Sequence, residues 1–391
     1  MDGTGQAMKV GISRERREHE HRVAATPDTV KKLISLGFDV TVEKDAGAGA
    51  SLLDQAYQAV GATIAADAAA ALQDADIVLK VQRPLTEAEG GPNELSYMKA
   101  GTKLIASLSA YANPDQVKAY AAAKVDAFAM ELLPRITRAQ SMDVLSSQSN
   151  LAGYRAVLEA CNVFGRGMPM MMTAAGTVAP ARVLILGAGV AGLQAVATAK
   201  RLGAVVSAFD VRPAVKEQVE SLGATFIEVE SEETEAAETT AGYAKEMSED
   251  YKRKQSELIH ETLKKQDIVI PTALIPGKPA PILITETMVR DMKPGSVIVD
   301  LAIEAGGNCA LSEEGVVEVH GVTIIAYPNL PSRIAEDASA LYAKNLLNFL
   351  TPLVDLETKE LNIDPEDEII QGTQLTQGGT IIHSAFSGKG D

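Results

Sequence analysis

The stretch from Val183 to Gly192 constrains the fold of this 391-residue chain more than any other region of the sequence. An apolar run that ends at Leu186 leads into the glycine pattern of residues 187–192, and a helical run from Leu193 to Arg201 follows. In such a pattern the first glycine permits a tight turn, the second lets the backbone approach a pyrophosphate, and the third allows close packing of helix on strand. The stretch therefore predicts a strand–turn–helix unit that binds a dinucleotide. Its predicted contact residues are Gly187, Ala188, Gly189, Val190, Ala191 and Gly192.

An acidic residue at the end of the next predicted strand indicates which dinucleotide binds. Asp210 follows the apolar run Val205 to Phe209 and lies about 20 residues after Gly187, the offset expected of the acid that binds the adenosine ribose. A carboxylate there accepts a hydrogen bond from the 2'-hydroxyl and repels a 2'-phosphate, which favours NAD over NADP. Two alternatives stay open, because Arg212 can accept a phosphate and Asp210 can instead cap a helix that begins at Pro213.

Short apolar runs alternate with helical patterns along the chain, and this alternation predicts parallel sheets in an α/β fold. A first series of predicted strands comprises Lys9 to Ile12, Val40 to Glu43, Ile77 to Val81, Lys103 to Ala106 and Val125 to Ala129. A second series comprises Arg182 to Leu186, Val205 to Phe209, Ala224 to Ile227, Asp267 to Ile270, Ser296 to Asp300 and Val322 to Ala326. We therefore expect two Rossmann-like domains, each built on a parallel sheet.

The order of the predicted elements also suggests where the domains divide. A chain of this length exceeds the size of one ordinary hydrophobic core. Two long helical segments, Ser147 to Phe164 and Ile334 to Leu350, flank the second series and are expected to join the domains. The hypothesis is a discontinuous first domain made of residues 1–144 and 350–391. Residues 145–349 would then form the NAD(H)-binding Rossmann domain together with the linking helices.

Composition and charge exclude several classes of function. The formal net charge of -16, from 52 acidic and 36 basic residues, opposes binding to nucleic acid. Cys161 and Cys309 are too few for a disulfide framework and indicate reduced thiols in a cytoplasmic protein. The N-terminus becomes strongly charged at Arg14 and does not have the pattern of a signal peptide. The longest uncharged windows, Gly167 to Ala181 and Val183 to Ala199, are short for a membrane span.

Two polar segments have more than one interpretation. Glu228 to Glu238 holds six glutamates, and it is either a solvated acidic loop or the arm of a mobile lid with Tyr243 at its tip. His19 and His21 lie close together, but the charged residues around them are typical of a solvated turn. Since no further ligand cluster accompanies them, we expect no metal site.

A long segment that starts at Met130 points to a known family. It reads Met-Glu-Leu-Leu-Pro-Arg-Ile-Thr-Arg-Ala-Gln-Ser-Met-Asp-Val-Leu-Ser-Ser-Gln-Ser-Asn-Leu-Ala-Gly-Tyr154. This segment closely resembles the signature of the NAD(H)-binding subunit of proton-translocating NAD(P) transhydrogenase. Further stretches that resemble the family are Gly242 to Met247, Thr272 to Pro281, Glu304 to Asn308 and Lys344 to Pro352. The similarity covers nearly the whole chain from Val10 onward.

The resemblance implies a set of site residues. In that family an Arg-Gln-Asp loop contacts the nicotinamide end of the cofactor, and Arg135, Gln140 and Asp143 occupy the matching positions. Arg135 and Gln140 are then expected to hold the carboxamide and ribose, while Asp143 orients one of them by a charge-assisted bond. Without the motif, a surface ion pair between Arg135 and Asp143 would be the simpler interpretation. Ser146 and Tyr154 match neighbouring positions, and Tyr243 matches the tip of a mobile loop that closes over the nucleotide.

The resemblance also implies a reaction and partners. NADH on this chain would donate hydride to NADP+ on a separate NADP(H)-binding subunit, coupled to proton movement through a membrane-spanning proton-channel subunit. Direct hydride transfer requires no acid or base, so a site that lacks a catalytic histidine, cysteine or metal fits this chemistry. A homodimer is expected by the same analogy. The chain would lie in the cytoplasm, attached peripherally to the cytoplasmic face of the inner membrane through its partner subunits.

Alanine dehydrogenase, a relative with the same two-domain plan, provides the alternative function. Arg22 and Lys80 match that family's substrate-carboxylate and catalytic lysine positions. The same family needs a catalytic histidine in a Leu-His-Leu context, where this chain has Ser107-Leu-Ser-Ala110. Since Ser109 cannot replace histidine as a proton shuttle near neutral pH, oxidative deamination of an amino acid is the weaker hypothesis.

Overall fold

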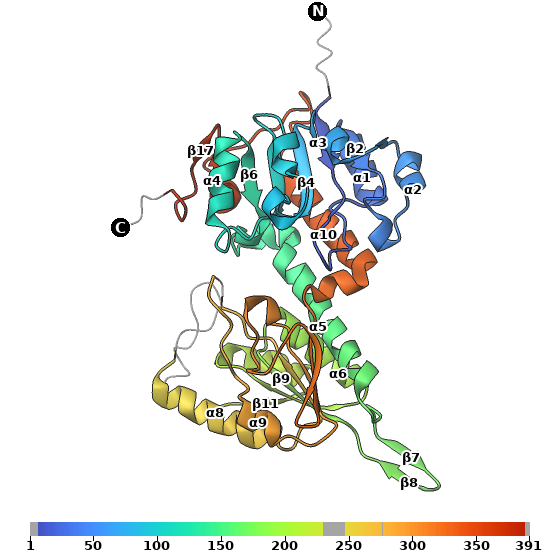
Figure 1. Ribbon diagram of the computed structural model, residues 1–391, viewed down its shortest axis with the longest axis vertical. Helices are drawn as coiled ribbons and strands as arrows, with labels where there is room; N and C mark the ends of the chain where they lie inside the picture. The colour runs from blue at the N-terminus through green and yellow to red at the C-terminus, as the bar shows by residue number, and fades with distance from the viewer. Residues whose placement is uncertain (1–6, 230–246, 276, 388–391) are drawn as a thin grey trace, which may run out of the picture. The chain divides into compact units, whose positions relative to one another are not determined.

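The computed structural model describes residues 7–229, 247–275 and 277–387, which divide into two compact units (Figure 1). Unit 1 comprises Met1–Gln148 and Ser332–Asp391, and unit 2 comprises Ser149–Pro331. The boundaries differ from those expected. The helix from Ala335 to Leu350 belongs to unit 1 rather than to the nucleotide domain, because its buried side chains, including Leu346 and Phe349, pack in the unit 1 core.

Unit 1 is built on a six-stranded parallel sheet with the order β3-β2-β1-β4-β5-β6. Its strands are β1 (Lys9–Ile12), β2 (Asp39–Glu43), β3 (Thr63–Ala65), β4 (Ile77–Gln82), β5 (Lys103–Ser107) and β6 (Asp126–Ala129). Its helices are α1 (Pro27–Ser35), α2 (Asp54–Ala59), α3 (Ala68–Leu72), α4 (Pro114–Ala122), α10 (Ala335–Leu350) and α11 (Glu368–Thr373). A short two-stranded sheet of β16 (Thr376–Gln377) and β17 (Thr380–Ile381) completes it.

Local sequence explains where the first helix begins and ends. Thr26 caps α1 through its side chain, which accepts the N–H of Thr29, and Pro27 occupies the first turn, where its missing N–H costs nothing. The chain turns at Gly37, whose φ of 102° is readily adopted only by glycine. The helix predicted from Pro27 to Leu36 is confirmed to within one residue.

Unit 2 is built on a seven-stranded sheet with the order β11-β10-β9-β12-β13-β15-β14, in which β14 alone runs antiparallel to its neighbour. Its strands are β9 (Arg182–Leu186), β10 (Val205–Phe209), β11 (Thr225–Ile227), β12 (Ile268–Pro271), β13 (Val297–Val299), β14 (Gly315–Val319) and β15 (Val322–Ala326). Its helices are α6 (Val190–Arg201), α7 (Lys216–Ser221), α8 (Glu249–Leu263) and α9 (Glu286–Arg290), and α5 (Val144–Val163) begins in unit 1 and continues into unit 2.

The α/β class with parallel sheets is confirmed, and every predicted strand is present with its ends shifted by two residues at most. Two edge strands, β3 and β14, were not predicted. The first has only three residues, and the second alternates half-buried with exposed side chains at the sheet edge. Neither offers the continuous apolar run that identifies a buried parallel strand.

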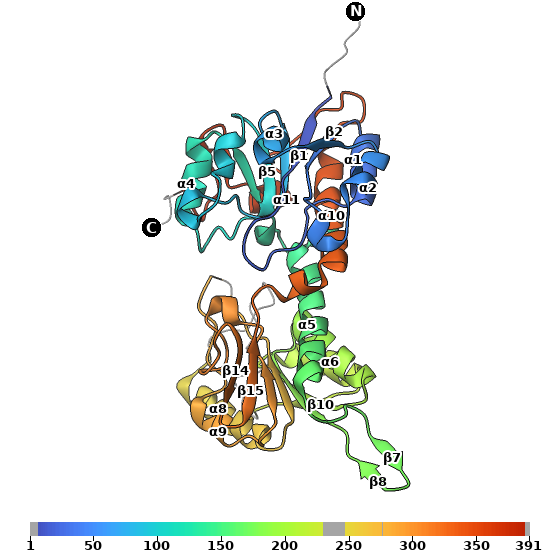
Figure 2. The same ribbon diagram turned by 45° about the vertical axis from the view of Figure 1, so that its right-hand side comes forward.

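A third unpredicted feature is a hairpin of β7 (Met171–Thr173) and β8 (Gly176–Val178) in unit 2. It extends away from the sheet of its own unit in both views (Figures 1 and 2), and the side chains of both strands are exposed. Among the described residues, no helix has the length and apolar character needed to cross a membrane. The predicted acidic loop or lid falls largely on residues 230–246, which lie outside the described residues, as does Tyr243.

Candidate functional site

The glycine pattern forms the turn that joins β9 to α6 in unit 2. Gly187 has φ 99° and donates its N–H to the Phe209 carbonyl at 2.8 Å. A Cβ on Gly192 would stand 1.8 Å from the Gly187 oxygen, so only glycine allows α6 to approach the strand this closely. A Cβ on Gly189 would meet no protein atom within 4 Å. The middle glycine thus faces open space at the start of α6, where helix amides favour a phosphate.

Asp210 lies at the end of β10 beside this turn and is nearly buried. Its Oδ2 accepts the Ala188 N–H at 2.7 Å, so the carboxylate holds the backbone of the glycine loop directly. Arg212 binds the same carboxylate, with its N–H and Nε both 2.9 Å from Oδ1 and its Nη2 2.8 Å from Oδ2. The turn at Pro213–Val215 has Arg212 as its N-cap and no side-chain cap bond, so Asp210 does not cap it as the alternative proposed.

The segment after β12 closes against the glycine turn. Thr272 Oγ1 contacts the carbonyl oxygens of Leu186 and Gly187 at 3.2 and 3.0 Å. Asn308 is fully buried, and its side chain accepts the Ala273 N–H and donates to the Ala273 carbonyl, at 3.0 and 2.9 Å. Thr272 and Asn308 lie in stretches whose sequence resembles the family, but neither residue was predicted to have a role. The contact between Asn308 and Ala273 joins residues 35 apart, which no local pattern reveals.

Helix α5 reaches the same turn within unit 2. A Cβ on Gly153 would lie 2.0 Å from the Ala191 carbonyl oxygen, so the glycine lets α5 pack against the first turn of α6. Tyr154, the next residue, is 39% exposed. Tyr154 thus follows the point where α5 contacts α6, and its role at the nucleotide stays a prediction.

The other predicted contacts lie in unit 1, on the segment that connects β6 to α5. Arg135 and Gln140 are exposed, and Gln140 lies in the turn Thr137–Met142. Asp143 accepts the N–H and the Oγ–H of Ser146, at 2.9 and 2.5 Å, and so caps the start of α5. The structure brings Asp143 and Ser146 together in this way.

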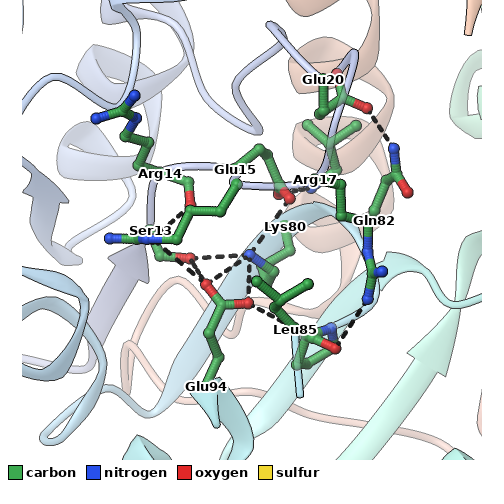
Figure 3. A network of polar contacts seen from close by, with 12 residues as sticks. Ser13, Arg14, Glu15, Arg17, Glu20, Lys80, Gln82, Leu85 and Glu94 are labelled. Carbon is green, nitrogen blue, oxygen red and sulfur yellow. Dashed lines mark hydrogen bonds and ion pairs between the residues drawn. The ribbon is translucent and has the colours of Figure 1, made fainter. Parts of the chain in front are cut away.

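A buried cluster of charges lies at the carboxyl ends of β1 and β4 in unit 1 (Figure 3). Lys80 Nζ lies 3.4 Å from Glu15 Oε2 and 3.1 Å from Glu94 Oε2, and all three side chains are at most 3% exposed. Burial raises the pKa of Glu15 to about 6, with the nearby charge of Glu94 adding to the rise. Burial opposes the charge on Lys80, but the two carboxylates outweigh it and raise the pKa of this lysine.

A second buried pair lies next to this cluster. Arg22 donates from Nη2 and Nε to the two oxygens of Glu20, at 2.6 and 2.8 Å, and from Nη1 to Gln148 at 2.8 Å. Gln82 donates to Glu20 at 2.7 Å. Burial alone would raise the pKa of Glu20, but the adjacent Arg22 guanidinium lowers it to about 2. Arg22 and Lys80 are thus enclosed charges, each bonded to carboxylates of its own unit.

Comparisons with known proteins identify the family. The family model described as the alanine dehydrogenase/PNT N-terminal domain matches residues 11–152, and the one described as the alanine dehydrogenase/PNT C-terminal domain matches residues 156–384. This chain belongs to the alanine dehydrogenase/PNT family. The resemblance stated from the sequence motifs is confirmed.

Within the alanine dehydrogenase/PNT family, the transhydrogenase branch is the more similar. An NAD(P) transhydrogenase alpha-subunit protein of Rhodospirillum rubrum is 61% identical over 384 residues, covering 98% of this chain and all of that protein. A transhydrogenase crystal structure from Sinorhizobium meliloti matches with a TM-score of 0.85 and 51% identity, covering 96% of this chain and all of that one. Alanine dehydrogenase of Halomonas elongata is 30% identical over 380 residues, covering 95% and 94% of the two chains. This chain is therefore homologous, along nearly its whole length, to transhydrogenase alpha subunits.

The position expected to carry the alanine dehydrogenase histidine lies in a tight turn in this chain. Ser109 is exposed and has φ 50°. The amides on either side of it, of Leu108 and Ala110, donate to the Glu131 carboxylate at 2.9 and 3.0 Å. Burial raises the pKa of Glu131. Among the residues that the structure describes, no group of three metal-ligating side chains is present.

Proposed function

We propose that this chain is the NAD(H)-binding component of a proton-translocating NAD(P) transhydrogenase. Bound NADH supplies a hydride from its nicotinamide ring, and NADP+ on a partner subunit accepts it. The observation that carries the proposal is the glycine turn, open at Gly189 and bordered by Asp210, in a chain 61% identical to a transhydrogenase alpha subunit. This turn fits a dinucleotide, because it offers helix amides for the pyrophosphate and a carboxylate for the ribose.

The residues of this chain then act by binding and orientation alone. The first turn of α6 holds the phosphates, and Asp210 selects the unphosphorylated ribose. By the family match, Arg135 and Gln140 hold the nicotinamide end, while Asp143 fixes the start of α5 next to them through Ser146. Since hydride passes without a proton, the chain needs no titrating group near neutral pH for the transfer.

We also infer a homodimer and peripheral attachment to membrane-spanning and NADP(H)-binding partner subunits. The hairpin of β7 and β8 supports the homodimer. Its Met170, Met171, Met172 and Val178 side chains are between 37% and 78% exposed, an apolar surface that a second copy of the hairpin can cover. Exposed strand edges offer backbone bonds to the same partner.

The substitution Gln140→Asn tests the proposed function. It keeps the amide but shortens the side chain by one methylene, a displacement of about 1 Å that costs on the order of 100-fold in a geometry-sensitive step. Single-turnover hydride transfer from NADH to an NADP+ analogue, with the NADP(H)-binding subunit saturating, measures this step. NADH affinity is measured in parallel by equilibrium titration.

We expect slow transfer with NADH affinity nearly unchanged, because the glycine turn and Asp210 remain intact. Transfer at the parental rate would contradict the role of Gln140 and require the hydride site to be sought elsewhere. Turnover of alanine or pyruvate by the chain alone would favour the dehydrogenase alternative.

A further inference from the structure

The carbonyl group next to Gln140 is held by two asparagines of α10 in unit 1. Ser141 O accepts the Asn345 Nδ2 and the Asn348 Nδ2 hydrogen bonds, each 2.9 Å long. The two asparagines are three residues apart, so both amides emerge from one face of the helix. A carbonyl oxygen has two lone pairs, and both are used here by side chains of the same helix.

The orientation of the inner asparagine is itself fixed. Asn345 is nearly buried, and its Oδ1 accepts the Ser147 Oγ–H at 2.7 Å. Because the Ser141 carbonyl can only accept a hydrogen bond, the nitrogen of the Asn345 amide faces Ser141 and its oxygen faces Ser147. Asparagine is a poor residue for a helix interior, and two of them on a packed face are stabilising only with these partners.

The turn that carries Gln140 ends in a weak hydrogen bond of its own. It is a single stretch of 3-10 helix from Thr137 to Met142, and its last turn closes through a 3.4 Å bond from Asp143 N to the Gln140 carbonyl. Bonds of this length and geometry are weak. A second tether of this turn is the bidentate pair of Arg138 and Asp367, in which the arginine side chain is 52% exposed. This pair does not bind the Ser141 peptide.

We propose that Asn345 and Asn348 are positioning residues for hydride transfer, which act by fixing the Ser141 peptide and through it the side chain of Gln140. This inference rests on the proposed function of Gln140. It also assigns a role to the stretch from Lys344 to Pro352, whose sequence resembles the family and whose role was open. Loss of either amide lets the peptide plane rotate and moves Gln140 without touching the glycine turn of unit 2.

The test compares matched variants in the assembled transhydrogenase. Asn348→Ala removes the half-buried asparagine and with it one of the two donors to Ser141 O. Asn345→Asp keeps the size of the buried side chain but removes the amide N–H groups that donate to the same oxygen. Arg138→Gln is the control, because it removes the ion pair with Asp367 from the same turn but leaves both hydrogen bonds to the Ser141 carbonyl in place. Each is assayed for single-turnover hydride transfer, for NADH affinity and for thermal unfolding.

We expect Asn348→Ala to slow transfer about tenfold and Asn345→Asp by up to about 100-fold, the range set by displacements near 1 Å. NADH affinity should change less than about threefold, and Arg138→Gln should leave the rate within about twofold. Equal slowing by Arg138→Gln and Asn348→Ala would overturn the proposal, since any loosening of the turn would then suffice. Parental rates in both asparagine variants would also overturn it.

A double-mutant cycle separates this inference from the proposed function. If the asparagines act through Gln140, adding Asn348→Ala to a Gln140→Asn chain should slow transfer less than about threefold further, because the shared interaction is already lost. Fully additive slowing, with Gln140→Asn itself slow, would overturn the positioning role and leave the proposed function standing. A parental rate in Gln140→Asn alone would contradict the proposed function instead. Asn348→Ala keeps the test valid if Asn345→Asp fails to fold.

Discussion

At the scale of single residues, Asp210 performs two tasks at the end of β10. It holds the Ala188 amide of the glycine turn, and it accepts one bond from the Arg212 backbone N–H and two from the Arg212 guanidinium. The arginine that the sequence left open as a phosphate ligand is therefore bound by the carboxylate that we propose selects against a 2'-phosphate. Removing the carboxylate removes these bonds to the guanidinium, so we expect nucleotide preference to depend on the pair rather than on Asp210 alone.

Asp210→Ala should weaken NADH binding by about tenfold to 100-fold, since a hydrogen bond to a charged group contributes about 1.5 to 3 kcal/mol. It should also strengthen NADPH binding, because it removes the negative charge that repels a 2'-phosphate and competes for Arg212. Equilibrium titrations with both nucleotides measure this change. Asp210→Ala combined with Arg212→Ala serves as the control, in which the gain for NADPH should vanish. Unchanged affinity for both nucleotides in Asp210→Ala would show that the carboxylate does not face the ribose.

Glu15 predicts a pH dependence of stability. Its pKa is raised from 4.5 to about 6 in the folded chain, so the folded state binds the proton more tightly and its contribution to stability is lost as pH rises through that range. The shift corresponds to about 2 kcal/mol. The substitution Glu15→Gln removes this titration. Relative to Glu15→Gln, the parental chain should therefore lose about 2 kcal/mol of unfolding free energy between about pH 4.5 and pH 7.

Denaturant unfolding of the two chains across that pH range provides the measurement. The quantity compared is the change with pH of the difference in unfolding free energy between the two chains. A pH-independent cost of losing the Lys80 contact therefore cancels. A difference that stays flat with pH would mean that Glu15 titrates near its ordinary pKa, despite its burial beside Glu94.

At the scale of elements, the glycines of the β9–α6 turn differ in why glycine is needed. Gly192 is required by packing, since its Cβ would overlap the Gly187 oxygen, whereas Gly189 has no protein atom to meet. The backbone of Gly189, with φ -76°, is one that any residue can adopt. A requirement for glycine at position 189 would thus come from the ligand and not from the fold.

Gly189→Ala and Gly192→Ala form a discriminating pair. Gly189→Ala should leave the thermal midpoint within about 1 °C but reduce NADH affinity at least about tenfold, because the methyl group occupies the space of the pyrophosphate. Gly192→Ala should destabilise unit 2 by about 1 to 3 kcal/mol, the usual cost of an overpacked contact. Calorimetry and NADH titration distinguish the two effects. Normal NADH binding by Gly189→Ala would place the phosphates elsewhere.

At the scale of the whole molecule, the parallel strands of the two sheets share one order. Both run third, second, first, fourth, fifth and sixth strand, and unit 2 adds the antiparallel β14 at its edge. In such sheets ligands bind beyond the carboxyl ends of the first and fourth strands. In unit 2 that position holds the glycine turn and Thr272. In unit 1 it holds the buried cluster of Lys80, Glu15 and Glu94, so the equivalent place is filled by the chain itself.

The proposed homodimer is tested through the hairpin. Met172 lies at the hairpin and is 78% exposed. A lysine at this position should be tolerated in the monomer, where it is solvated, but not in an apolar dimer interface. Met172→Lys should raise the dimer dissociation constant at least about tenfold, as loss of a central apolar contact does. Sedimentation velocity over a concentration series measures it. Leu356→Lys, at an exposed apolar residue of unit 1, is the matched control, and equal weakening by both variants would assign the interface elsewhere.

The sequence by itself determined the eleven strands of the two predicted series, the glycine turn and the position of Asp210 after β10, because each follows from short-range periodicity or from residue spacing along one strand–turn–helix unit. Only the tertiary structure decided that α10 belongs to unit 1, that Arg212 is paired, and that Asn345 and Asn348 hold Ser141. The last two contacts join residues 204 and 207 positions apart. Such contacts depend on strand order and helix packing over the whole unit, and neither can be predicted from local patterns in the sequence.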